Sequence, residues 1–153
     1  MKQFGLLTYA LDPSQQGVSF TLGLNRIVET YNSRIDPIVF YKEYYQQIIT
    51  PLFCMMQEVE MWNFPHTVIS TTLENTTKLL SCPIPTKKLF YILNLEWLYE
   101  KNQNYELLRN IYNNKSIELI VKSQDHFNIV KSCWKKPIGI VEDIHFEKIV
   151  QFI

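Results

Sequence analysis

Short apolar runs recur along the chain, and each is followed by polar turn residues and then by a stretch with helical spacing. The runs are rich in β-branched and aromatic residues, which is typical of strands buried on both faces of a sheet. Strands that alternate with helices indicate a parallel α/β sheet, because parallel strands need crossover connections. The predicted strands are residues 4–9, 37–41, 66–71, 88–94, 117–122 and 137–142.

Helical spacing is clearest from about residue 18 to residue 32, where an apolar stripe recurs every three or four positions. Shorter helices are predicted around 74–80, 105–112, 127–134 and 145–152. The segment 43–64 suits either a buried helix or a helix broken near Pro51, and we favour a helix over about 52–61. These elements predict a single domain over residues 1–153, a three-layer Rossmann-like or flavodoxin-like sandwich with about six mostly parallel strands.

The charge balance narrows the range of partners. Fifteen basic residues match fifteen acidic ones, so there is no bulk attraction to nucleic acid or to an anionic membrane. Three widely spaced cysteines fit a reducing compartment, and no apolar stretch is long enough to span a bilayer. We therefore expect a soluble cytoplasmic protein that binds no nucleic acid. A single alanine beside abundant Asn, Ile, Lys, Tyr and Phe is associated with AT-rich genomes, such as those of phages, and a viral protein would act in the host cytoplasm.

Several cofactor and catalytic signatures are absent from the sequence. The four glycines form neither a GxGxxG fingerprint nor a GxxxxGK[ST] phosphate loop. The three histidines have no metal-ligand spacing with one another or with the cysteines. No GxSxG elbow supports nucleophilic hydrolysis. We therefore predict no cofactor and no metal site.

The carboxyl ends of the predicted strands supply the candidate ligand site, because parallel strands bring these ends to one edge of the sheet. Three of the candidates have a structural alternative. Ser123 suits a helix cap, and the acidic pair Glu142 and Asp143 suits either ligand hydroxyls or the start of a helix. The polar candidates at this edge are Asp12, Gln16, Gly17, Thr71, Asn94, Ser123, His126, Glu142 and Asp143.

Glu96 and Trp97 follow the strand predicted over 88–94. A carboxylate can accept a proton from a hydroxyl group, and a tryptophan ring can stack on a sugar or a base. The pair therefore suggests Glu96 as a catalytic base and Trp97 as a ligand contact. Ordinary loop and packing roles are the alternative for both residues.

Two segments resemble parts of a known family. The loop Tyr9-Ala-Leu-Asp-Pro-Ser-Gln-Gln-Gly-Val-Ser-Phe-Thr-Leu resembles the N-terminal loop of GT-B glycosyltransferases, and the stretch from Ile117 to Asp143 is similar to the end of one Rossmann-like half of such an enzyme. The resemblance implies that Gln16 and Gly17 shape an acceptor loop, that Glu96 acts as the base, and that Glu142 and Asp143 hold hydroxyls.

The resemblance implies a domain that binds a sugar or nucleotide-sugar, as a minimal transferase or as one half of a split enzyme. Two departures from the family pattern bear on this reading. Gln16 stands before Gly17 where family members commonly carry a pair of small residues, and the chain provides one Rossmann-like half where GT-B enzymes have two. A lone half would need a partner subunit to complete the site, or it would work without catalysis.

The alternative is a non-catalytic interaction module that binds a partner protein or a second copy of itself. It is suggested by aromatic residues that would mark a partner surface if exposed. A polar cleft at the strand ends would instead favour the sugar-binding reading. A response-regulator-like domain is set aside, because Asp12 stands alone where such domains carry an acidic pair. The aromatic residues are Phe40, Tyr41, Tyr44, Tyr45 and Trp62.

Overall fold

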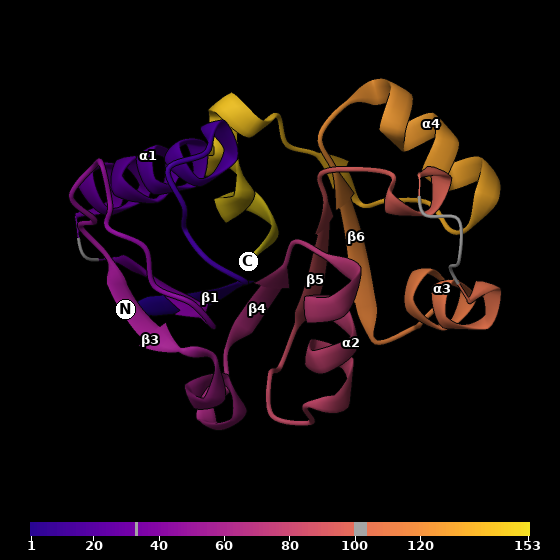
Figure 1. Cartoon of the computed structure of the whole chain (residues 1–153), viewed down its shortest axis with the longest axis horizontal. Helices are drawn as coiled ribbons and strands as arrows, with labels where there is room; N and C mark the ends of the chain where they lie inside the picture. The colour runs from indigo at the N-terminus through magenta and orange to yellow at the C-terminus, as the bar shows by residue number, and fades with distance from the viewer. Residues whose placement is uncertain (33, 100–103) are drawn as a thin grey trace.

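A computed structural model of the chain describes residues 1–32, 34–99 and 104–153. These residues form one sheet of seven parallel strands in the order β3-β2-β1-β4-β5-β6-β7 (Figure 1). The first six strands have the order of a Rossmann fold, and β7 is added at one edge. The strands are β1 (Lys2–Thr8), β2 (Ile35–Tyr41), β3 (Cys54–Gln57), β4 (Thr67–Ser70), β5 (Lys88–Ile92), β6 (Ile117–Val121) and β7 (Gly139–Ile140).

Helices cover both faces of the sheet and complete a Rossmann-like three-layer domain (Figure 1). One face carries α1 (Gln15–Tyr31) and the 3₁₀ segment η3 (Asp143–Phe152), which pack on each other. The other face carries α2 (Leu73–Ser81), α3 (Tyr105–Tyr112), α4 (Gln124–Cys133) and η1 (Glu58–Asn63), and a short turn η2 (Glu96–Leu98) follows β5. No helix among the described residues is long and apolar enough to cross a membrane.

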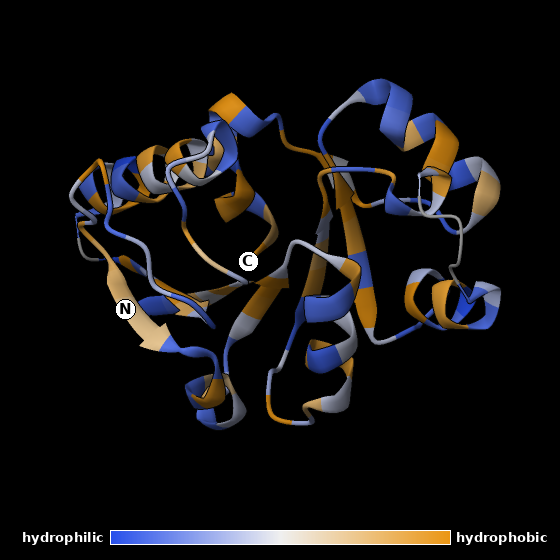
Figure 2. Ribbon diagram, in the orientation of Figure 1, coloured by the Kyte–Doolittle hydropathy of each residue, from blue (hydrophilic) through white to orange (hydrophobic). Residues whose placement is uncertain are grey.

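The core lies on both sides of the strands, because successive side chains alternate between the two faces. In β5, Leu89 and Tyr91 pack with α1 and η3, whereas Phe90 and Ile92 pack against the opposite helices. Hydrophobic residues accordingly fill the central strands, and polar residues cover the outer helix surfaces (Figure 2). Near-continuous apolar runs are therefore required in the strands, and this is why their positions are readable in the sequence.

The chain reverses its direction across the sheet between β1 and β4. From β1 it continues through α1 to β2 on one side, and from β4 it continues through α2 to β5 on the other side. The loops that leave β1 and β4 therefore separate toward opposite faces. Such a switch point opens a crevice at the carboxyl ends of the two strands.

The prediction of a helix over 52–61 is wrong. Residues 54–57 form the edge strand β3, which pairs with β2, and a 3₁₀ turn follows it. The cause is a period of two in the burial: Phe53 and Met55 pack into the core beside α1, whereas Cys54 and Met56 are exposed. Consecutive apolar residues hide this period in the sequence, so the sheet has one more strand than predicted.

Smaller differences concern the ends of elements. Helix α1 starts at Gln15, because Ser14 caps it, and it ends at Asn32 in the left-handed conformation, with φ of 43°. The last strand is limited to Gly139–Ile140, and the terminal helix is a 3₁₀ segment that starts at Asp143 and kinks at His145. The predicted single α/β sandwich is otherwise confirmed.

Candidate polar pocket at the switch point

A polar pocket of about 130 Å³ opens at the carboxyl ends of β1 and β4, where the switch point predicts a crevice. We call it the first lobe. The β1–α1 loop and the start of α1 form one wall, and the residues that follow β4 and β5 form the other. Its lining residues are Thr8, Tyr9, Ala10, Asp12, Ser14, Gln16, Gly17, Phe20, Thr71, Thr72, Leu93, Asn94 and Glu96.

The β1–α1 loop folds tightly around the helix start. Ser14 caps α1 by accepting a hydrogen bond from the Gly17 amide at 3.2 Å. A Cβ atom at Gly17 would lie 2.1 Å from the backbone oxygen of Asp12, so this close approach requires glycine. The Asp12 carboxylate accepts hydrogen bonds from the amide and the hydroxyl of Ser14. A negative charge of the protein itself therefore stands at the α1 N-terminus, where a Rossmann loop holds a pyrophosphate.

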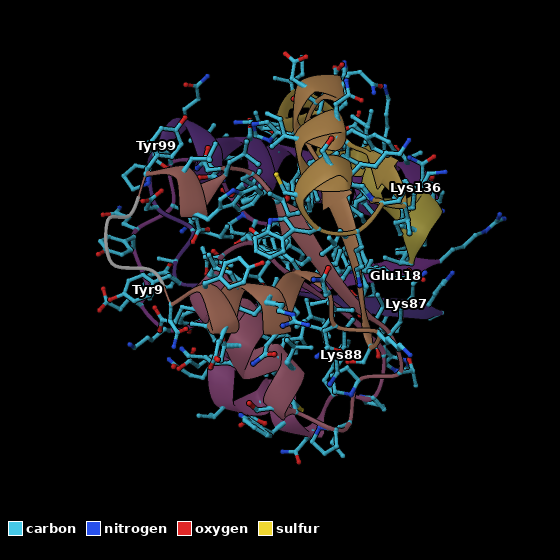
Figure 3. The ribbon with its side chains drawn as sticks, turned by 90° about the vertical axis from the view of Figure 1, so that its right-hand side faces the viewer. Tyr9, Lys87, Lys88, Tyr99, Glu118 and Lys136 are labelled. Atoms are coloured by element: carbon cyan, nitrogen blue, oxygen red, sulfur yellow. The ribbon has the colours of Figure 1, made fainter. Side chains whose placement is uncertain are left out.

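Tyr9 supplies an aromatic wall that the sequence analysis did not identify. Its hydroxyl donates to Glu43, and the Lys42 ammonium lies 5.3 Å from the centre of its ring. Hydrogen bonding to Glu43 raises the pKa of Tyr9 to about 12. Figure 3 shows Tyr9 on the side of the molecule opposite Lys87 and Glu118, which lie toward the amino ends of the strands. Tyr9 had an identifiable signal, since it directly follows a buried strand.

Glu96 lies on the opposite wall, beside the start of α2. Its carboxylate accepts a long hydrogen bond of 3.4 Å from the Leu73 amide, the first residue of α2. This contact orients the carboxylate, and Thr72 caps the same helix by accepting from the Asn75 amide at 3.2 Å. None of the described residues that line the first lobe is a lysine, arginine or histidine. Its ionisable carboxylates are those of Asp12 and Glu96.

A second lobe of about 240 Å³ adjoins the first and shares Gln16, Leu93 and Asn94 with it. It is also lined by Gln15, Ser19, Lys122, Asp143 and Ile144. The single hydroxyl proton of Tyr91 is shared between the Val141 carbonyl at 2.7 Å and the Asp143 carboxylate at 3.2 Å. Burial, with the nearby Asp143 charge, raises the pKa of Tyr91, so this phenol stays a donor.

The two lobes bring together seven of the predicted site residues. Asp12, Gln16, Gly17, Thr71, Asn94 and Glu96 line the first lobe, and Asp143 lines the second together with Gln16 and Asn94. Sequence reasoning missed Tyr9 and Lys122. Lys122 follows β6 directly, so its position at a strand end was an available signal.

The remaining predicted residues do not line either lobe. Trp97 instead packs edge-on against Tyr112 and Trp134, with ring centres 4.7 and 6.0 Å away. Ser123 caps α4 by accepting from the His126 amide at 3.2 Å. These contacts match the structural alternatives for the two residues.

His126 and Glu142 also lie outside the lining. Desolvation, together with the Lys122 charge, lowers the pKa of His126. Glu142 is exposed at the start of η3, where its side chain makes no capping hydrogen bond. Within the described ranges, no group of three or more His, Cys, Asp or Glu side chains could hold a metal ion.

The five aromatic residues of the predicted partner surface differ in exposure, and Tyr41 is half-buried. Phe40 is fully buried and packs edge-on against Phe64. Tyr44, Tyr45 and Trp62 are exposed, at 64, 43 and 45%. An exposed aromatic group and a polar pocket therefore occur in the same molecule.

The fold and the pocket together define a Rossmann-like α/β domain with a two-lobed polar pocket at its switch point. No protein-family model matches the chain, and no curated protein matches it either.

Proposed function

We propose that the chain binds a sugar in the first lobe. The observation that carries the proposal is the lining, which combines hydroxyl, amide and carboxylate groups with one aromatic wall and, among the described residues, no positive charge. Sugar hydroxyls both donate and accept hydrogen bonds, so they suit a wall of this mixed kind. The carboxylates of Asp12 and Glu96 disfavour an anionic group here.

Each wall has a role in this proposal. Gln16 and Asn94 are exposed side chains at the junction of the lobes and can donate and accept through their amide groups. Tyr9 offers a ring whose position is fixed by Glu43. In this proposal Tyr9 stacks on the sugar, a role that the sequence suggested for Trp97.

The glycosyltransferase form of the proposal adds a chemical step. Glu96 would accept the proton of the acceptor hydroxyl as that oxygen attacks the anomeric carbon of a nucleotide-sugar, and the nucleoside diphosphate would leave. Each lobe is smaller than a typical small-molecule site of about 300 Å³ or more. A nucleotide-sugar would therefore extend across both lobes, and a partner subunit would cover the part that projects from them.

Calorimetric titration tests sugar binding with a panel of neutral monosaccharides, namely glucose, galactose, mannose and N-acetylglucosamine. Gln16→Ala should weaken the binding of the preferred sugar about fivefold or more, because a hydrogen bond contributes about 1 kcal/mol. Gln151→Ala is the matched control, since Gln151 is exposed and lines neither lobe. Equal affinities for the two variants, or no binding by the wild-type chain, would contradict the proposal.

A turnover assay tests the transferase form separately. In this form Glu96→Gln abolishes transfer from a nucleotide-sugar and retains sugar binding, because the amide still forms hydrogen bonds but takes up no proton. Unchanged turnover would remove Glu96 from the mechanism.

A protein-binding surface is the second candidate, and the exposed residues of the β2–β3 connection favour it. Tyr44 and Ile48 are 64% and 72% exposed. Large exposed apolar side chains that lie together commonly mark partner surfaces. A Tyr44→Ser, Ile48→Ser variant should lose a partner that the wild-type chain retains in affinity capture, whereas Gln16→Ala should keep it.

A further inference from the structure

Lys122 is the positively charged residue of the second lobe and lies at the carboxyl end of β6. Its ammonium lies 3.5 Å from the Asn94 amide oxygen, at the outer limit of a hydrogen bond. It joins none of the ion pairs found among the described residues. Its charge therefore faces the lobe without a carboxylate in contact.

Three lysines that line neither lobe are held by structural partners. Lys78 pairs with Glu58 at 3.0 Å and with Glu74 at 3.2 Å. Lys87 pairs with Glu118 at 3.0 Å and donates to the Phe152 carbonyl (Figure 3). Lys135 donates to the carbonyls of Asn114 and Ile117. These ammonium groups have structural partners, whereas that of Lys122 has only a weak neutral one.

Asp143 is the acidic residue of the same lobe, and it does not contact Lys122. Asp143 accepts from the Tyr91 hydroxyl and forms no ion pair with Lys122 within 4.0 Å. A ligand in this lobe thus meets an ammonium group without a carboxylate partner and, separately, a carboxylate that can accept from a hydroxyl. The α1 N-terminus is not an alternative anion site, because the Asp12 carboxylate stands there.

We propose that the sugar bound in the first lobe carries an anionic oxygen group, a phosphate or a carboxylate, and that Lys122 binds this group in the second lobe. This inference rests on the proposed sugar binding. The lobes adjoin at Gln16, Leu93 and Asn94, which line both, so a ligand that extends past these side chains would contact both lobes. The neutral hydroxyls then lie beside Tyr9 and Glu96, and the anion lies at Lys122.

Calorimetric titration of the full chain with glucose, glucose 6-phosphate and glucuronate, and with the same three forms of galactose and mannose, tests the inference. An anionic form should bind about tenfold tighter than its neutral sugar, because a charge-assisted hydrogen bond is stronger than a neutral one. The phosphate and uronate arms show which anion is preferred. Lys122→Met should bring the ratio of affinities for the anionic and neutral forms close to one. Lys122→Arg should retain the ratio.

Lys131→Met is the matched control, since Lys131 is an exposed lysine on α4 that lines neither lobe. Removing the Lys122 charge should also raise the pKa of His126, which NMR titration detects in a folded variant without any ligand. Equal affinities for neutral and anionic forms would overturn the role of Lys122 and leave sugar binding intact. An anionic preference that survives in Lys122→Met would overturn it as well. Failure of every sugar to bind the wild-type chain would overturn both proposals.

Discussion

Gly17 allows the β1–α1 loop to pass close to the start of α1 at the pocket. A Cβ atom at this position would lie 2.1 Å from the oxygen and 2.9 Å from the nitrogen of Asp12, and backbone atoms cannot move aside as a flexible side chain can. Gly17→Ala should therefore lower the free energy of unfolding by about 2 kcal/mol or more, as overpacking does. Urea denaturation measures the change. Thr30→Ala, at an exposed position of the same helix, should stay within about 0.5 kcal/mol of the wild type.

The hydrogen bond between Tyr9 and Glu43 controls the titration of the Tyr9 phenol. The Glu43 carboxylate accepts from the Tyr9 hydroxyl and stabilises its protonated form, so the pKa of Tyr9 is raised to about 12. Glu43→Gln removes the negative charge and should bring this pKa back toward the ordinary value of about 10. The difference in phenolate absorbance between each protein and its Tyr9→Phe derivative isolates this group. An unchanged Tyr9 titration would show that Glu43 does not hold the ring.

Ser123 stabilises helix α4 as its N-cap. It accepts from the His126 amide at the start of α4 and lines neither lobe. Ser123→Ala should therefore lower the free energy of unfolding by about 1 kcal/mol, the usual contribution of an N-cap, and Ser123→Asp should retain the stability. Sugar affinity should be the same in all three proteins. If Ser123→Ala lost sugar affinity without losing stability, Ser123 would be a binding residue and not only a helix cap.

At the element scale, the sequence predicted strands better than it predicted the segment between β2 and β4. Buried strands such as β5 are apolar on both faces, so they appear as continuous runs that need no periodicity to be recognised. In β3 only one face is buried, and the exposed Met56 makes the solvent face look apolar too. The two-residue period of a strand could therefore not be distinguished there from the period of a helix.

The candidate site was predictable as an edge of the sheet but not as a cavity. Strand ends placed Asp12, Thr71, Asn94 and Glu96 on one edge, and the structure brings them into one lobe. Whether a side chain faces that lobe depends on tertiary contacts that sequence does not express. Trp97 packs on Tyr112, whereas Tyr9 lines the lobe and donates to Glu43.

At the scale of the whole molecule, two buried tyrosines link stability to alkaline pH. Burial raises the pKa of both Tyr91 and Tyr112. In the unfolded chain they ionise near the ordinary pKa of about 10, so above that pH the unfolded state binds fewer protons than the folded one. Their contribution to stability is thus fully present below about pH 10 and is lost as the pH rises toward their folded-state pKa. The slope is about 1.4 kcal/mol per pH unit for each tyrosine.

The two phenylalanine variants separate this linkage from ordinary hydrogen bonding. Tyr91 donates to the Val141 carbonyl, so Tyr91→Phe should lower the free energy of unfolding at neutral pH by about 1 kcal/mol. The Tyr112 hydroxyl is buried without a hydrogen-bond partner among the described residues, so Tyr112→Phe should be neutral or stabilising. Both variants should nevertheless reduce the slope of the free energy of unfolding against pH above about pH 10. Each single variant should remove the contribution of one tyrosine, and the double variant should remove both. Urea titrations between about pH 8 and about pH 11 measure both quantities. A slope unchanged in both variants would mean that neither phenol is kept protonated by burial in the core on which the pocket rests.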